Sequence, residues 1–114
     1  MSYYNNIKIL LIISALLSGF LTAGTAGKIT GKVVDQKTGE PLVGCNVIVL
    51  ETALGAATNL DGTYFILNVP PGRYALKASM IGYGSVQMND LQVIVDLTAK
   101  ADFFLSSEVI EGQQ

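Results

Sequence analysis

Turn-forming residues recur about every 10 residues along most of this chain, and the runs between them are too short for anything except strands. The stretch TNLDGTYFILNVPPGRYAL, residues 58–76, contains two such signals, Asn-Leu-Asp-Gly and Pro-Pro-Gly, each followed by an apolar run. No window shows the periodicity of an amphipathic helix. The spacing therefore predicts an all-β fold, a small antiparallel β-sandwich of about seven strands.

The two turn signals have specific chemistry. Asn59 can accept hydrogen bonds from the backbone that follows it, and Gly62 stands where a three-residue hairpin loop needs a positive φ. At the second signal, Pro71 fixes φ and Gly72 would supply the left-handed position of a type II turn. We therefore expect a strand hairpin at residues 59–62, followed by a second corner.

Seven segments fit strands by their β-branched and aromatic residues or by their alternation. Residues 46–50 are apolar on both faces, as a central strand would be, and residues 74–80 could present an edge to a partner. Gly82 and Gly84 indicate a bulge or corner around a packed Tyr83. The predicted strands are residues 29–34, 46–50, 56–58, 63–67, 74–80, 91–97 and 101–105.

Residues 1–26 predict an export signal. Lys8 and the amino terminus precede an apolar run, residues 9–21, and small residues follow as far as Gly27. We expect cleavage after Ala26. The alternative is a retained membrane anchor, but the run is shorter than the roughly 20 residues that span a bilayer, and no basic stop follows it. A lipoprotein anchor is disfavoured because no cysteine lies near the cleavage region.

The remaining chain is long enough for one small domain. Of 114 residues, nine are acidic and seven basic, and the signal contains only one of the basic residues. This weakly acidic balance offers no basic field for nucleic acid. Cys45 is the only cysteine, and its valine neighbours indicate a buried, inert thiol. We predict a sandwich at residues 27–106 and the start of a truncated linker at residues 107–114.

The sequence lacks the residue sets that catalysis requires. It contains no histidine, which excludes Ser-His-Asp and Cys-His nucleophile systems and removes the commonest zinc ligand. Asn59 and Asp61 could begin a calcium loop, but the residues after Gly62 break the pattern of oxygen ligands. The carboxylates are scattered singly, and most of them fall in predicted turns: Asp35, Glu40, Glu51, Asp61, Asp90, Asp96 and Asp102. We predict that the chain is not an enzyme and has no catalytic, metal-binding or cofactor-binding residues.

Two other features could contact a ligand. Arg73 is the only arginine, and it is interpreted as a solvated or cross-strand residue at the start of a strand. Tyr64, Tyr74 and Tyr83 could form a face that stacks on sugars, yet Tyr64 and Tyr74 also occupy strand positions where rings fill cores. We favour core packing, and carbohydrate binding stays an alternative.

Two long segments carry a recognisable pattern, ITGKVVDQKTGEPLVGCNVIVL at residues 29–50 and GAATNLDGTYFILNVPPGRYALKASMIGY at residues 55–83. Their motifs are Gly31-x-Val33-x-Asp35, Thr38-Gly39-Glu40-Pro41-Leu42, Gly44-x-Asn46-Val47, Thr58-Asn59-x-Asp61-Gly62-x-Tyr64, Pro71-Gly72-x-Tyr74 and Gly82-Tyr83. In this order they resemble the carboxypeptidase regulatory-like domain, a family with a transthyretin-like β-sandwich. The family is an accessory module on many proteins, so the resemblance is specific for fold rather than for function.

One setting of that family resembles this chain. In Bacteroidetes and related bacteria the module follows a signal peptide at the front of TonB-dependent outer-membrane receptors, and ADFFLSSEVIEGQQ, residues 101–114, looks like the join to the plug domain. The resemblance implies the N-terminal module of a truncated receptor, exported to the periplasm or outer membrane. Its partners would be the receptor plug and barrel and the energy-coupling protein. The alternative is a secreted, stand-alone module that binds carbohydrate or protein.

Overall fold

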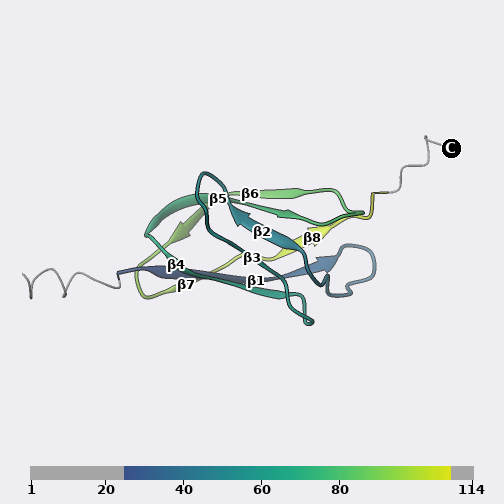
Figure 1. Ribbon diagram of the computed structural model, residues 1–114, viewed down its shortest axis with the longest axis horizontal. Coiled ribbons are helices and arrows are strands. Elements are labelled where there is room, and N and C mark those ends of the chain that lie inside the picture. The colour runs from purple at the N-terminus through teal and green to yellow at the C-terminus, as the bar shows by residue number, and fades with distance from the viewer. Residues whose placement is uncertain (1–24, 109–114) are drawn as a thin grey trace, which may run out of the picture.

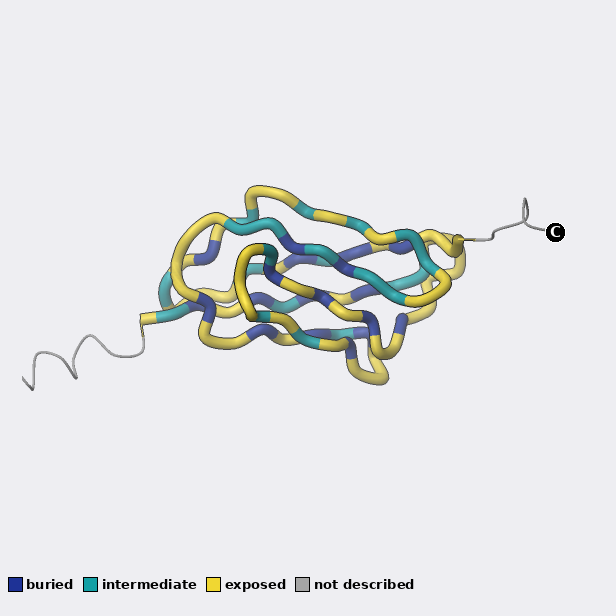
Figure 2. Tube along the Cα trace, turned by 45° about the horizontal axis from the view of Figure 1, so that its top comes forward, coloured by how far each residue is buried: buried dark blue, intermediate teal, exposed yellow. Residues whose placement is uncertain are grey.

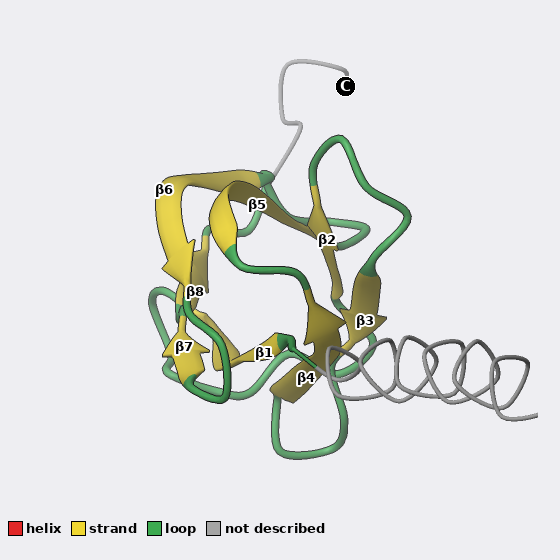
Figure 3. Cartoon of the chain, turned by 90° about the vertical axis from the view of Figure 1, so that its left-hand side faces the viewer, coloured by secondary structure: helices red, strands yellow, loops and turns green. Residues whose placement is uncertain are grey.

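Two four-stranded sheets stack face to face in residues 25–108, the part of the chain that this computed structural model describes (Figures 1 and 3). The predicted export signal lies outside the described residues except for its last two. No helix in the described part is long and apolar enough to cross a membrane. The strands are β1 (Gly27–Asp35), β2 (Asn46–Val49), β3 (Gly55–Ala57), β4 (Thr63–Val69), β5 (Gly72–Ser79), β6 (Val86–Val93), β7 (Thr98–Lys100) and β8 (Phe103–Leu105).

The strand order confirms the predicted all-β sandwich and adds a parallel component. One sheet has the order β4-β1-β7, with β8 also paired to β1, and the other has the order β3-β2-β5-β6. β1 is antiparallel to β4. It is parallel to β7 and β8, because after β6 the chain returns to this sheet at the end where β1 begins and runs in the same direction as β1. The described residues thus form eight strands rather than about seven.

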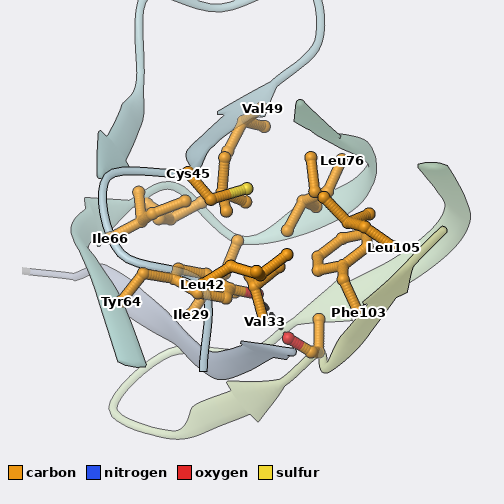
Figure 4. Close-up of a cluster of buried hydrophobic side chains, with 14 of the residues drawn as sticks. Ile29, Val33, Leu42, Cys45, Val49, Tyr64, Ile66, Leu76, Phe103 and Leu105 are labelled. Carbon is orange, nitrogen blue, oxygen red and sulfur yellow. Dashed lines mark hydrogen bonds between the residues drawn. The ribbon is translucent and has the colours of Figure 1, made fainter. Parts of the chain in front are cut away.

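The core lies between the two sheets and follows from the alternation of the strands. Along β1, Ile29 and Val33 face the interior while Lys28 and Lys32 are exposed, and Figure 2 shows buried and exposed residues alternating in this way. Burial of each large apolar side chain contributes about 1.5–3 kcal/mol. The largest fully buried side chains, all labelled in Figure 4, are Tyr64, Phe103, Ile29, Leu76 and Leu105.

The turn at residues 59–62 has the predicted chemistry but a different role. The side-chain oxygen of Asn59 accepts hydrogen bonds from the backbone N–H groups of Asp61 and Thr63, at 3.0 and 3.1 Å, and Gly62 has a φ of 76°. The hairpin prediction is wrong, because β3 and β4 on either side of this turn belong to different sheets. Gly62 packs directly against β1 and Pro41, which directs β4 into the sheet of β1.

The second corner, between β4 and β5, also passes from one sheet to the other. Gly72 has a φ of 156°, close to extended, so the type II turn that required φ near +80° is wrong. A left-handed residue, Asn68 with a φ of 58°, instead lies inside β4, just before its end at Val69. The two prolines that follow then hold the chain extended across the end of the sandwich.

The observed bounds differ from the predicted ones by one or two residues in most strands, and by more in the strand predicted at residues 91–97. The strand expected at residues 91–97 is β6, which begins at Val86 and ends at Val93, because Asp96 adopts a φ of 62° in a turn. The polar residues of the first half of β6 concealed it, since an edge strand can turn polar side chains to solvent. The strand expected at residues 101–105 is β8, which begins only at Phe103, and β7 at Thr98–Lys100 was not predicted.

Two further expectations concern where strands lie within their sheet. β2 is an interior strand, as predicted, but only one of its faces is buried, since Ile48 is 42% exposed. The prediction that residues 74–80 offer an edge is wrong, because β5 lies between β2 and β6. The predicted corner at Gly82 is present, with a φ of 88°, and Tyr83 beside it packs partly against the core.

Three hydrogen bonds hold the chain in place at the break between β7 and β8. The Tyr64 hydroxyl donates to the Ala101 carbonyl at 2.5 Å, and the Ala101 N–H donates to the Thr30 carbonyl of β1 at 2.9 Å. One residue further on, the Asp102 carboxylate accepts the backbone N–H of Lys32 at 2.9 Å. β1 therefore keeps its hydrogen-bonded neighbours across the break.

We expect Gly62→Ala to destabilise the fold more than Gly39→Ala does. Both glycines have nearly the same φ, 76° and 77°, so each alanine carries a similar left-handed penalty of about 1 kcal/mol. A Cβ on Gly62 would also stand 2.8 Å from Pro41 and from the Val33 carbonyl, whereas Gly39 has open space. We expect a loss of about 2–4 kcal/mol for Gly62→Ala in denaturant unfolding. Equal losses of unfolding free energy for Gly62→Ala and Gly39→Ala would contradict the close packing of Gly62 against Pro41 and Val33.

The Tyr64 hydroxyl can be tested with Tyr64→Phe, with Tyr74→Phe as its control. Removing the Tyr64 hydroxyl leaves the buried Ala101 carbonyl without that donor, which we expect to cost about 1–3 kcal/mol. The Tyr74 hydroxyl donates to the Pro70 carbonyl in an exposed setting, where water can replace it, so that loss should stay below about 0.5 kcal/mol. Thermal unfolding of both variants gives the comparison.

Candidate functional site

The carboxylates of the described residues remain separate in space. Residues 25–108 contain no group of three acidic, cysteine or histidine side chains that could hold a metal ion. Lys100 and Asp102 form the one ion pair found there, at 3.7 Å between exposed groups. The side-chain oxygen of Asn59 already accepts two backbone N–H groups, so the calcium loop considered at residues 59–62 lacks a free first ligand.

Asp35 is the carboxylate with the most defined surroundings. One of its oxygens accepts the backbone N–H groups of Lys37 and Thr38, at 2.8 and 3.1 Å, and the other accepts the Tyr83 hydroxyl at 2.9 Å. The Thr38 N–H, followed by the Tyr83 hydroxyl, lowers the pKa of Asp35 below its ordinary value. The hydrogen bond from the Tyr83 hydroxyl to Asp35 raises the pKa of Tyr83 above its ordinary value. This arrangement closes the turn after β1 and ties it to the corner after β5.

The three tyrosines considered for sugar stacking do not share a face. Tyr64 is buried in the core, with its ring centroid 6.4 Å from that of Phe103 (Figure 4). Tyr74 bonds to the backbone of its own corner, and Tyr83 bonds to Asp35. The core position predicted for Tyr64 is confirmed, and a stacking platform that includes Tyr64 is excluded by its burial.

Arg73 lies exposed at the start of β5, as expected, and pairs in register with Gln92 of β6. It borders an open hollow of about 570 Å³, together with Glu51 and Tyr74. No ion pair joins Arg73 to Glu51 among the described residues. The polar groups of Glu51, Arg73 and Tyr74 therefore border this hollow without converging on one point.

Cys45 occupies the core, as predicted. It is fully buried, and its thiol donates to the Ser79 carbonyl at 3.4 Å. Burial raises the pKa of this thiol, so the reactive thiolate is disfavoured.

The surface that sequence reasoning missed is the outer face of β4 and β1. Phe65 and Leu67 of β4 point away from the core, where they are 54% and 58% exposed. Lys28 and Lys32 of β1 point to the same side of the sheet. The signal was present in the sequence, because Tyr64 and Ile66 alternate with these two residues and only one set can face inward.

The fold and these surfaces define a small β-sandwich whose described residues offer contact surfaces rather than a convergent set of reactive groups. The chain matches the CarboxypepD_reg-like domain family over residues 29–114, and it belongs to that family. This confirms the family indicated by the sequence motifs.

One curated relative gives the match a context. Over 102 residues the chain is 32% identical to TonB-dependent receptor P39 of Formosa agariphila. The match covers 87% of this chain and 10% of the receptor, so the chain spans about a tenth of that relative.

Solved structures share the fold at low identity. A chain of a type II cohesin–X-dockerin complex from Acetivibrio cellulolyticus has a TM-score of 0.59 and 20% identity, with 71% of this chain and 58% of that chain covered. The Bacillus anthracis TIE protein has a TM-score of 0.56 and 19% identity, with 73% and 17% covered. The minor pilin GBS52 of Streptococcus agalactiae has a TM-score of 0.54 and 16% identity, with 75% and 46% covered.

The lowered pKa of Asp35 predicts a pH-dependent contribution to stability. Because the folded pKa lies below the ordinary value of 3.8, the unfolded chain takes up the proton first on acidification. The contribution is therefore complete above that value and is lost as pH falls through the folded pKa. We expect Asp35→Asn to lower the free energy of unfolding near neutral pH, and the difference from the native chain to vanish in acid. A difference that does not change with pH would contradict this role.

Proposed function

We propose that this chain is a non-catalytic accessory module of a TonB-dependent outer-membrane receptor and that it acts by contact. The single observation that supports this most strongly is the 32% identity to a TonB-dependent receptor over most of the chain. The family match over residues 29–114 supports the same assignment. The module would be the N-terminal part of the receptor, and residues 107–114 would begin the linker to the plug.

The way the chain leaves the sandwich supports this arrangement. Near the end of the described residues, the Gly84 N–H donates to the Ser106 carbonyl at 3.0 Å, and the Glu108 N–H donates to the Gly82 carbonyl at 2.8 Å. β1 begins at the opposite end of the sandwich (Figure 1). The backbone as far as Glu108 is therefore held against the sandwich, at the end opposite the start of β1, and a plug further along the chain would follow from that end.

A contact role agrees with the chemistry of the surface. Most described carboxylates serve turns or stand apart from one another, the thiol is buried, and one outer sheet face presents exposed apolar and cationic side chains. Its nearest partners would be the plug and barrel and the energy-coupling protein. The location would be the periplasm or the outer membrane, with the predicted export signal supplying the route.

The second candidate is a stand-alone secreted module that binds protein or carbohydrate. The protein form is favoured over the carbohydrate form by one observation: Tyr64 is buried, and the exposed rings of Phe65 and Phe104 lie on the outer face of a sheet beside lysines. Such a module would be released rather than retained in the envelope.

Envelope fractionation separates the two candidates. With an antibody against the sandwich, we expect a species far larger than 12.1 kDa in the outer-membrane fraction, because the module would be joined to a plug and barrel. Reading the DNA downstream of the Gln114 codon should show a plug-like frame. A small species free in the medium, with a stop codon after Gln114, would replace the receptor assignment with the stand-alone one. Fractionation should use an inner-membrane marker and a known barrel protein as references.

A further inference from the structure

The two sheets end in edge strands, and these edges differ in their protection. Unpaired strand edges invite another strand, and proteins usually protect them with short strands, charges, prolines or bulges. Among the described residues the edges are β3 and β6 in one sheet, and β4 and the β7–β8 row in the other. Three of these four carry such protection.

The protected edges use different means. β3 is three residues long. β7 and β8 are also three residues each, and the Lys100–Asp102 ion pair stands at the break between them. β6 has eight residues, but Asp90 adopts a φ of 59° within it, and the pairing with β5 shifts register. None of the three offers a long, regular template.

β4 has no such protection over residues 63–67, and its one irregularity lies at its far end, where Asn68 has a φ of 58° and the register with β1 shifts before Val69. Its seven residues, TYFILNV, contain no charge and no proline. Residues 63–66 pair with β1 in unbroken register, and the irregularity comes only near the far end. Phe65 and Leu67 are more than half exposed on its outer face. Of the described edges, β4 is the one open to a further strand.

The hydrogen-bond parity of β4 shows which backbone groups face outward. Val33 donates to the Gly62 carbonyl at 2.8 Å, so this pair and every second pair after it are the bonded pairs of the β1–β4 ladder. Thr63 accordingly faces away from β1, and its N–H and C=O bond to Asn59 instead. By the same alternation, the N–H and C=O groups of Phe65 face away from β1, and Leu67 occupies the next outward position, just before the register shift at the end of β4.

A cationic stripe lies directly beside this edge. Lys28 and Lys32 project from β1 on the same face as Phe65 and Leu67, and Lys100 lies one strand further on. Asp102, which lies close to them, is engaged by the Lys32 N–H and by Lys100, and Asp96 borders a hollow together with Lys28 and Leu67. The face is thus apolar at its edge and positively charged behind it.

We propose that β4 is a docking edge that accepts an extended segment of a partner protein as an added strand, and that this segment alternates apolar and acidic side chains. Main-chain bonds to Phe65 and Leu67 would give the pairing, and alternate side chains would select the partner. Because side chains alternate between the two faces of a strand, the carboxylates would lie on the outer face, where they reach the lysines of β1, and the apolar side chains would lie on the inner face, beside the buried residues of β4. The proposal does not depend on the receptor assignment, because it follows from β4 and β1 alone.

Charge complementarity favours this occupant over a second copy of the chain. β4 itself is uncharged, so two copies could pair through it, but their lysine stripes would then face the same side of one continuous sheet. An acidic strand instead brings counter-charges to Lys28 and Lys32. Like-charge repulsion therefore disfavours self-pairing, and opposite charge favours the acidic segment.

The test uses two synthetic decapeptides, (Val-Glu)5 and (Val-Lys)5, titrated into the purified chain and followed by backbone amide NMR. We expect (Val-Glu)5 to slow hydrogen exchange at the amides of Phe65 and Leu67, with no new protection at Tyr64 or Ile66, which already bond to β1. (Val-Lys)5 should bind at least tenfold more weakly. Unchanged exchange at Phe65 and Leu67 with both peptides would overturn the docking edge, and equal affinities would overturn the acidic selectivity.

Matched variants separate strand addition from docking on the face. Leu67→Glu should weaken (Val-Glu)5 binding at least tenfold. If Leu67→Glu lowers the melting temperature of the fold, Phe65→Glu serves as a second variant for the same test. Phe104→Glu is the control, since Phe104 is similarly exposed, at 60%, on the same sheet but in β8; it should change affinity no more than about twofold. Equal losses at positions 67 and 104 would overturn strand addition in favour of face docking.

Two further outcomes would replace the proposed occupant. Concentration-dependent dimers that Leu67→Glu abolishes would make a second copy of the chain the occupant. Protection of the same amides by phosphatidylglycerol vesicles would make a lipid surface the occupant.

Discussion

The bond between the Tyr64 hydroxyl and the Ala101 carbonyl is the contact on which the β1 sheet depends. It satisfies a buried carbonyl at the point where β7 ends and β8 has not begun, which would otherwise be costly. Gly31 makes the approach possible, because a Cβ there would stand 1.7 Å from that carbonyl oxygen. Asp102 then supplies the acceptor that the broken ladder lacks, and Phe103 can enter the core beside the Tyr64 ring.

Features fixed by local chemistry could be predicted from the sequence, and features fixed by pairing between distant strands could not. Asn59 and Gly62 form the predicted turn because both requirements lie within four residues. Whether that turn joins strands of one sheet or of two depends on how Gly62 packs against β1, which the turn residues do not encode. Asp90 illustrates the same limit, because its positive φ is a response to the register of β6 on β5.

The functional surface also has features that residue types predict and features that depend on strand pairing. Residue types alone led to the expectation of no catalytic, metal or cofactor set, and they placed Tyr64 and Cys45 in the core, where the structure has both. The open edge of β4 was not predictable in this way, because an edge is a property of strand order. Phe65 and Leu67 become informative only once β4 is known to be the last strand of its sheet.

β4 combines an open edge with an anchored inner face, and this combination determines how it could bind. Tyr64, Ile66 and Val69 are all buried, so the strand is held in place before any partner arrives. Adding a strand would then order mainly the incoming segment, which lowers the entropic cost of association. An uncovered apolar edge also carries the risk of self-association. Lys28 and Lys32 oppose a second identical face and attract an acidic one, so the same two charges serve both solubility and partner choice.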